Sequence, residues 1–405
     1  MVNKIKFGIL KETKNPPDRR VAVTPNQAKE ILNKFPNVEV FAQKSELRCF
    51  NDKEYSSLNI PLSDNISDCD ILIGVKEVAV DALLENKTYI FFSHTAKKQP
   101  YNQKLLQEII KKKITLLDHE YFTDKNKLRL VAFGKWAGIV GAYNALIGFG
   151  LRNNLYKLKR AKDCFDFKEM IKHVEEVKLP NIKILITGGG RVAKGAMETL
   201  APLKLKYVKP DEFISKTFNE PVICQIDADT YTRHKNGNAF DIKHFFANPT
   251  EYESTFRPFA ENADIYIAAH YWDPKSPEFI TENDFKSGKI KIQFIADISC
   301  DIKHPIASTL RPSTIAEPFF GYNPVTGEEG SAFEKNNITV MTIDNLPGEL
   351  PRDASVEFGN TLVERVYPSL FGNDTEGIIE RATIVKNGKL TSAFSYLKAF
   401  AEGKE

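Results

Sequence analysis

A glycine-rich segment limits most strongly what this chain can fold into. Residues 182–186 form a mostly apolar run that leads into three glycines, Gly188, Gly189 and Gly190. Small residues at helical spacing follow directly. This order is typical of a buried strand, a tight turn and the start of a helix. The segment therefore predicts an α/β fold.

Gly188, Gly190 and Ala193 fit the dinucleotide-binding pattern G-x-G-x-x-G/A. The first glycine permits the sharp turn, the second lets the backbone approach a pyrophosphate, and the alanine lets helix and strand pack closely. The N–H groups at the helix start then face the phosphates. We expect a cofactor site made of Gly188, Gly189, Gly190, Arg191 and Val192. A glycine-rich loop in another kind of α/β protein is the alternative.

Length and charge narrow the class of protein. The chain has 405 residues, which suits two or three domains, and its hydrophobic content of 42% is typical of a folded soluble protein. The net charge is only +3, and the basic residues are spread along the chain. This argues against a nucleic-acid partner and leaves small acidic ligands open.

The five cysteines share no close spacing, and no cysteine–histidine metal pattern occurs. We therefore expect free thiols in a reducing compartment and no metal site. No apolar run is long enough to span a bilayer, and the first residues lack a signal-peptide pattern. The expected location is the cytoplasm, without a membrane partner.

Apolar strand patterns alternate with helical ones, which predicts parallel sheets. A helical stretch over 136–158 contains four glycines, each costing about 1 kcal/mol relative to alanine. Close packing between two domains would offset that cost. Asp297, His270 and Trp272 follow later strands, so they should face the same crevice as the glycine turn. The pattern over 354–367 predicts a helix with Val356, Leu362, Val363 and Val366 on its core face.

Four segments carry a resemblance to a known family: 91–99, 131–138, 296–299 and 343–347. They resemble lysine-forming saccharopine dehydrogenase, and more closely the lysine–ketoglutarate reductase half of aminoadipic semialdehyde synthase. The similarity runs nearly end to end. Alanine dehydrogenase and nicotinamide nucleotide transhydrogenase are more distantly similar. The resemblance implies two Rossmann-like parallel-sheet domains with the active site in a cleft between them. The substrate domain would comprise residues 1–136 and 337–405, and the NAD(P)-binding domain residues 137–336.

The implied reaction condenses the ε-amine of lysine with the ketone of 2-oxoglutarate, and a hydride from a nicotinamide cofactor reduces the imine to saccharopine. Lys76 and His94 match the acid/base positions of the family. A lysine can act near neutral pH only when burial or nearby cations depress its pKa. Structural roles are the alternative for both residues.

Further residues match the family's binding positions. Arg20 and Arg129 match its carboxylate binders, and a guanidinium can hold a carboxylate with two parallel hydrogen bonds. Glu77 and Glu120 match acidic positions near the family's active site, where they would hold Lys76 protonated or receive the amine of the lysine substrate. Glu77 can instead face away, because neighbouring strand residues alternate. Asp297 matches a position near the nicotinamide, with a loop hydrogen bond as its alternative. Asp344 and Arg352 belong to the matched C-terminal motif, where they contact ligand or brace the hinge.

Cofactor choice depends on the end of the second strand of the nucleotide domain. The family has an acid there, but this chain reads Val208-Lys209-Pro210, with Asp211 as the competing residue. A lysine favours the 2′-phosphate of NADP, and an acid favours the ribose hydroxyl of NAD. We therefore expect an NAD(P) cofactor with a preference for NADP. The family's turn also carries a Cys where Val192 stands.

Two other functions remain open from the sequence. An alanine dehydrogenase-like enzyme would use the same fold with ammonia and pyruvate. A non-catalytic NAD(P)-binding protein would keep the fold without the chemistry. The expected partners are small amino-acid and oxo-acid substrates, and the oligomeric state is left open.

Overall fold

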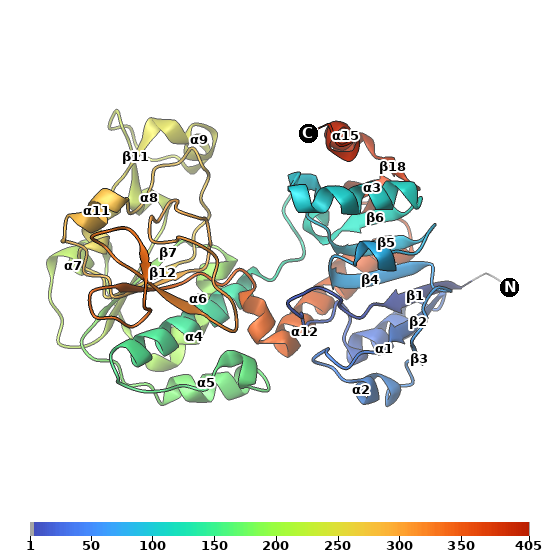
Figure 1. The fold of residues 1–405 in the computed structure, drawn as a ribbon, viewed down its shortest axis with the longest axis horizontal. Helices are drawn as coiled ribbons and strands as arrows, with labels where there is room; N and C mark the ends of the chain where they lie inside the picture. The colour runs from blue at the N-terminus through green and yellow to red at the C-terminus, as the bar shows by residue number, and fades with distance from the viewer. Residues whose placement is uncertain (1–3, 405) are drawn as a thin grey trace. The chain divides into compact units, whose positions relative to one another are not determined.

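The structure is a computed structural model that describes residues 4–404. It divides into two compact units, and both ends of the chain belong to the same one (Figure 1). Unit 1 contains the residues up to Phe133 and those from Pro351 onward, and unit 2 is Gly134–Leu350. The second crossing was expected at residue 337, which is wrong. Strand β16 (Ile338–Met341) pairs with strands of unit 2, so it stays in that unit.

Unit 1 is built on a sheet of eight strands in the order β18-β17-β6-β5-β4-β1-β2-β3. All neighbours are parallel except at β17 and β18. Its strands are β1 (Ile5–Ile9), β2 (Val38–Gln43), β3 (Leu62–Ser63), β4 (Ile71–Lys76), β5 (Thr88–Phe92), β6 (Thr115–Asp118), β17 (Thr383–Lys386) and β18 (Lys389–Leu390). Its α-helices are α1 (Pro25–Lys34), α2 (Asp52–Ser56), α3 (Gln103–Lys111), α12 (Pro351–Thr361), α13 (Tyr367–Phe371), α14 (Ile378–Ala382) and α15 (Lys398–Ala401).

Two apolar cores cover the two faces of this sheet. Ile73 and Val75 belong to one core, with residues of α1 and α12, and Leu72 to the other, with residues of α3 and α15. Adjacent residues divide in this way because successive strand side chains point to opposite faces. The polar strand ends thus emerge from a sheet that is covered on both faces.

Unit 2 contains a second sheet of eight strands, in the order β15-β14-β16-β13-β12-β7-β9-β8. Only β14 and β15 run antiparallel to their neighbours. The other strands are β7 (Lys183–Thr187), β8 (Lys206–Tyr207), β9 (Val222–Ile226), β12 (Ile265–Ala268), β13 (Phe294–Asp297), β14 (Phe319–Tyr322) and β15 (Glu329–Gly330). Its α-helices are α4 (Gly134–Arg152), α5 (Phe167–Glu175), α6 (Arg191–Leu200), α7 (Pro210–Ser215), α8 (Ala228–Tyr231), α9 (Ile242–Ala247), α10 (Arg257–Ala260) and α11 (Glu282–Lys286). A hairpin of β10 (Thr232–His234) and β11 (Tyr252–Ser254) is separate from this sheet.

The glycines of α4 pack inside unit 2, not between domains as expected. A Cβ at Gly138 would overlap the carbonyl oxygen of Val192 in α6, and a Cβ at Gly195 would overlap that of Lys135 in α4. The two backbones therefore approach more closely than any side chain permits. This contact fixes α6, whose first turn follows the glycine loop.

Other expectations need smaller corrections. The helix expected over 354–367 is α12 followed by a π-helical turn, Leu362–Val366, and then α13. Val356 is 41% exposed, so it does not join the core face with Leu362, Val363 and Val366.

Within residues 4–404, no helix has the length and apolar character needed to cross a bilayer. The five cysteines are free thiols, four of them buried.

Candidate active site

Lys76 and Glu77 emerge at the carboxyl end of β4 in unit 1. Burial lowers the pKa of the Lys76 ammonium, and the nearby Arg20 guanidinium lowers it further. The Glu77 carboxylate lies 2.7 Å from Lys14 Nζ, while its other oxygen is buried without a hydrogen-bond partner among the described residues. The pKa of Lys76 is thus shifted in the direction that a lysine needs to exchange protons with a substrate.

Arg20 is buried and paired with Asp18, a residue that we did not single out from the sequence. Its Nε and Nη2 donate to the two Asp18 oxygens at 3.0 and 2.6 Å. The guanidinium also lies over the Phe133 ring, 4.3 Å from its centroid. Although burial opposes ionisation, the Arg20 charge holds the pKa of Asp18 well below its usual range. A substrate carboxylate would have to share Arg20 with Asp18.

Glu120 lies in the turn after β6, and three basic side chains surround its carboxylate. Its Oε1 lies 2.8 Å from Lys97 Nζ and 3.5 Å from Arg129 Nη1, and its Oε2 lies 3.6 Å from His94 Nδ1. Burial opposes ionisation, but these neighbours lower the pKa of Glu120 to about 2. The structure therefore brings together three predicted residues, His94, Glu120 and Arg129. It adds Lys97, which lies within the 91–99 segment.

The backbone around His94 is fixed by a buried carboxylate. Asp118 Oδ2 accepts hydrogen bonds from the backbone N–H of Ser93 at 2.9 Å and from its hydroxyl at 2.5 Å. The other Asp118 oxygen accepts from the backbone N–H of Glu120. His94 itself has a left-handed backbone with φ of 53°. Asp118 thus joins the two loops that carry His94 and Glu120.

In unit 2, the glycine turn has the geometry that a dinucleotide needs. Gly188 has φ of +98°, and a Cβ there would meet the Ala269 carbonyl. A Cβ at Gly190 would have no atom within 4 Å, so space lies open where α6 begins. Arg191 and Val192 form the first turn of this ten-residue helix. The backbone N–H groups at the start of such a helix suit a pyrophosphate.

The strand order corrects the expectation for Lys209. Strand β8, which precedes Lys209, lies at the edge of the sheet, and β9 separates it from β7. On this side of the sheet the neighbour of β7 is therefore β9, and the acid that follows β9 is Asp227. A Cβ at Gly189 would overlap the Asp227 carboxylate. The sequence missed Asp227 because 37 residues separate it from Gly190, whereas the motif places the acid about 20 residues on.

Asp297 is fully buried at the end of β13 and braces the following loop. Its Oδ1 accepts from the backbone N–H groups of Ser299 and Cys300 and from the Ser299 hydroxyl, and its Oδ2 accepts from the Thr309 hydroxyl at 2.6 Å. These are the loop hydrogen bonds considered as the alternative. His270 is also buried, with Nδ1 2.7 Å from the Thr187 hydroxyl, and burial lowers its pKa to about 3.

The C-terminal motif is divided between the two units. Asp344 is exposed in unit 2. Arg352 lies in unit 1, where it donates to the Cys49 carbonyl and to Glu54, and its guanidinium lies over the Phe50 ring. These contacts of Arg352 all lie within unit 1.

Two side-chain clusters have donor types that metals use, namely Cys164 with Glu169 and His173, and His234 with His244 and Glu251. In the second cluster, His234 Nδ1 accepts a hydrogen bond from the backbone N–H of Asn236, so Nε2 carries the proton toward Glu251. In the first, Lys159 Nζ already lies 2.6 Å from Glu169. Both arrangements disfavour a cation.

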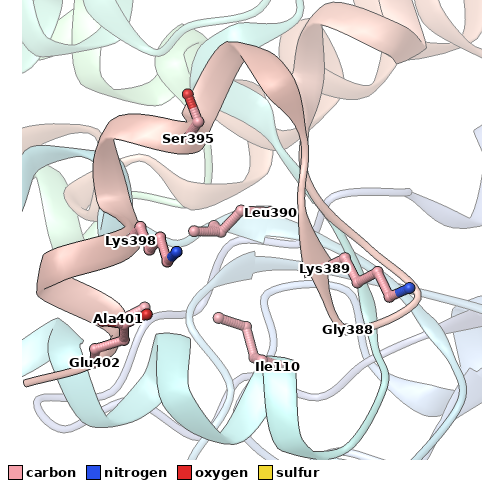
Figure 2. A pocket seen from close by; sticks show the side chains of 8 residues that line it. All are labelled: Ile110, Gly388, Lys389, Leu390, Ser395, Lys398, Ala401 and Glu402. Atoms are coloured by element: carbon pink, nitrogen blue, oxygen red, sulfur yellow. The ribbon is translucent and has the colours of Figure 1, made fainter.

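A separate hollow of about 420 Å³ lies in unit 1, between α3, β18 and α15 (Figure 2). Leu390 and Ile110 form its apolar side, and Lys398 reaches toward them. None of the predicted site residues lines it.

This chain is similar in sequence to one known protein family and to several characterised enzymes. The family described as alanine dehydrogenase/PNT, N-terminal domain, matches residues 8–140. The mitochondrial alpha-aminoadipic semialdehyde synthase of Bos taurus is 28% identical over 100% of this chain and 48% of its own length. This chain thus spans about half the length of that relative. The saccharopine dehydrogenase (NAD(+), L-lysine-forming) of Yarrowia lipolytica is 27% identical, over 94% of this chain and 96% of that protein.

Solved structures agree on the fold. An L-alanine dehydrogenase matches with a TM-score of 0.63 at 14% identity, covering 99% of this chain and 100% of that one. The transhydrogenase of Sinorhizobium meliloti matches with a TM-score of 0.58 at 13% identity, covering 95% and 98%. At such identities the likeness concerns the fold alone. Sequence and fold together make this chain a homologue of the lysine-forming saccharopine dehydrogenases, with an alanine dehydrogenase/PNT N-terminal domain.

Proposed function

We propose that this chain is a nicotinamide-dependent oxidoreductase that interconverts saccharopine with L-lysine and 2-oxoglutarate. The observation that carries the proposal is the cluster in unit 1. There, a lysine of lowered pKa lies near Arg20, and Glu120 gathers His94, Lys97 and Arg129. The relatives named as saccharopine dehydrogenases, which align over most of their length, support the same substrates.

The charges of the cluster suit a dicarboxylic oxo acid. The basic groups there are Lys14, Arg20, Lys76, Lys97 and Arg129, and they lie among the acids Glu12, Asp18, Glu77, Asp118 and Glu120. The two guanidinium groups can each hold a substrate carboxylate through paired hydrogen bonds. We assign the oxo-acid carboxylates to Arg20 and Arg129, and the ammonium of the lysine substrate to Glu77 and Glu120.

Lys76 and His94 are assigned the proton transfers. The substrate ammonium must lose a proton before its nitrogen attacks the ketone carbon. When the carbon–oxygen bond breaks, the two protons given up by nitrogen end on the oxygen, which leaves as water. A group that alternates between base and acid can move both, and the lowered pKa of Lys76 suits this. The nicotinamide, when bound, supplies the hydride that reduces the resulting imine.

For the cofactor, we propose NAD(H) in place of the NADP(H) that the charge of Lys209 led us to expect. The acid beside the glycine turn is Asp227, at the end of the strand next to β7. A carboxylate there can bond the ribose hydroxyls and would repel a 2′-phosphate. The fungal relatives, whose names specify NAD(+), support the same choice.

Free thiols support the proposed cytoplasmic location.

The proposal is tested by following reduced cofactor in the presence of lysine and 2-oxoglutarate, and oxidised cofactor in the presence of saccharopine. Ammonia with pyruvate, supplied separately, tests the alanine dehydrogenase alternative. We expect turnover only with the first two mixtures. Turnover with ammonia and pyruvate alone would favour the alternative, and cofactor binding without turnover in any mixture would favour a non-catalytic protein.

A further inference from the structure

The Glu12 carboxylate takes the place of a neighbouring strand at the end of β4. The pairing of β1 with β4 ends at Ile9 and Ile73, and the N–H of Leu10 still donates to the Ile73 carbonyl at 2.8 Å. Beyond that point, Glu12 Oε1 accepts from the backbone N–H of Val75 at 2.6 Å, and Oε2 accepts from that of Lys76 at 2.9 Å. One side chain thus binds both peptide groups just before the Lys76 side chain.

This segment needs such a partner because it departs from regular pairing. The register between β4 and β5 shifts between Ile73 and Lys76. Gly74 lies inside the shift, and its carbonyl accepts a hydrogen bond from His119 Nε2 at 2.9 Å. A Cβ at Gly74 would lie only 3.2 Å from Glu12 Oε1. Glu12 and His119 therefore hold the irregular segment through opposite backbone groups.

We propose that Glu12 is the positioning residue that holds the Lys76 backbone for proton transfer. The inference rests on the proposed function for the role of Lys76, and on the two hydrogen bonds for the role of Glu12. The sequence singled out Lys76 but not Glu12, because nothing in the order of residues shows that Glu12 reaches a strand 63 residues away.

The two hydrogen bonds from Glu12 to the β4 backbone depend on the protonation state of its carboxyl group. A carboxylate offers an acceptor oxygen to each N–H group, whereas a neutral carboxyl group has lost one of these acceptors to its own proton. Burial raises the pKa of Glu12 to about 7, and the Asp18 charge acts in the same direction. The two backbone hydrogen bonds and the Arg20 charge oppose this rise in pKa. Lys76, whose N–H binds Glu12, is itself a titratable group, and burial lowers the pKa of His119 to about 3, which keeps its ring neutral. The hold on Lys76 should therefore weaken as the pH falls through 7.

The first test does not depend on activity. The backbone amide proton shifts of Val75 and Lys76 are followed by NMR in the full chain across neutral pH. We expect both to titrate together with a midpoint near 7 in the wild type and not in Glu12→Gln. The matched control is Asp70→Asn, because Asp70 accepts from the Lys6 N–H at the other end of the same strand pair, at 2.8 Å. This control should keep the wild-type titration. Val75 and Lys76 amide shifts that are the same in the wild type and in Glu12→Gln at every pH would overturn the inference, and wild-type amides that do not titrate would overturn its pH dependence even if Glu12→Gln fails to fold.

The second test uses turnover. Glu12→Gln should lower kcat roughly 10- to 100-fold, as expected when a reacting group is misplaced, with the KM for the cofactor unchanged. The fall of activity on the acid side near pH 7 should disappear in this variant, whereas Asp70→Asn should keep it. Wild-type kcat and pH profile in Glu12→Gln would overturn the positioning role. A wild type that turns over none of the substrates refutes the proposed function instead, and the amide titration then still decides whether Glu12 holds Lys76.

Discussion

Asp227 lies against the glycine turn, with its carboxylate in the space that a Cβ at Gly189 would occupy. The contact exists because β9 pairs with β7 from Lys183 to Thr187. It places a negative charge beside the turn that we expect to bind the pyrophosphate. Cofactor selection should therefore follow Asp227 and not the residues after β8.

The wild type should prefer NADH over NADPH by at least about tenfold in kcat/KM, or about 1.4 kcal/mol. Asp227→Asn should reduce this ratio, because the carboxylate that repels the 2′-phosphate is gone. Lys209→Ala is the control and should leave the ratio unchanged. A preference for NADPH, or a ratio that depends on Lys209, would restore the expectation from the sequence.

Gly190→Ala should fold normally but bind NAD(H) weakly. The added Cβ meets no protein atom within 4 Å, and φ of −83° suits alanine, so stability should hardly change. The same Cβ would project into the space expected for the pyrophosphate. Gly138→Ala gives the opposite case, since its Cβ overlaps the Val192 backbone and should cost about 1–3 kcal/mol. Titration calorimetry and thermal unfolding of both variants check this, and tight NAD(H) binding by Gly190→Ala would contradict it.

Lys76→Met and His94→Gln should each lower kcat by roughly 10²- to 10⁴-fold, the usual range for loss of a general acid or base. Cofactor binding should stay near wild type, because the glycine turn belongs to unit 2. Steady-state kinetics and equilibrium titration with NADH check both parts. A variant with near wild-type kcat would remove that residue from the proton transfers.

The two arginines should respond differently to removal. Arg20→Ala leaves Asp18 buried without its main cation, which should destabilise unit 1 by about 3–5 kcal/mol. Arg129 is about one third exposed and pairs with Glu120 at 3.5 Å, so Arg129→Ala should fold and chiefly raise the KM for the oxo acid. Denaturant unfolding and kinetics of the two variants separate these effects. An unchanged KM in Arg129→Ala would exclude it as a carboxylate binder.

His119 should make unit 1 less stable in acid. Burial lowers its pKa from 6.5 to about 3. Between these two pH values, His119 is therefore neutral in the folded state and protonated in the unfolded state. This contribution is fully present above pH 6.5 and is lost as the pH falls from there toward 3. His119→Gln can keep the donor to the Gly74 carbonyl without the titration. Hydrogen exchange of peptides from β4 and β6 should show a shallower loss of stability in the variant, and parallel pH dependence would contradict this.

The sequence by itself determined the α/β class, the glycine turn and the residues at the strand ends, because these depend on patterns within about fifteen neighbouring residues. The turn at Gly188–Gly190 and the position of Lys76 at the end of a buried strand are of this local kind. Only the tertiary structure decided which strand lies beside β7, that β16 stays in unit 2, and that Arg20 is shared with Asp18. It also decided that Glu12 binds the backbone of Lys76. Strand pairing and buried polar contacts are selected by the packing and hydrogen-bonding needs of the whole sheet, and distant residues meet those needs without leaving a periodic signal in the chain.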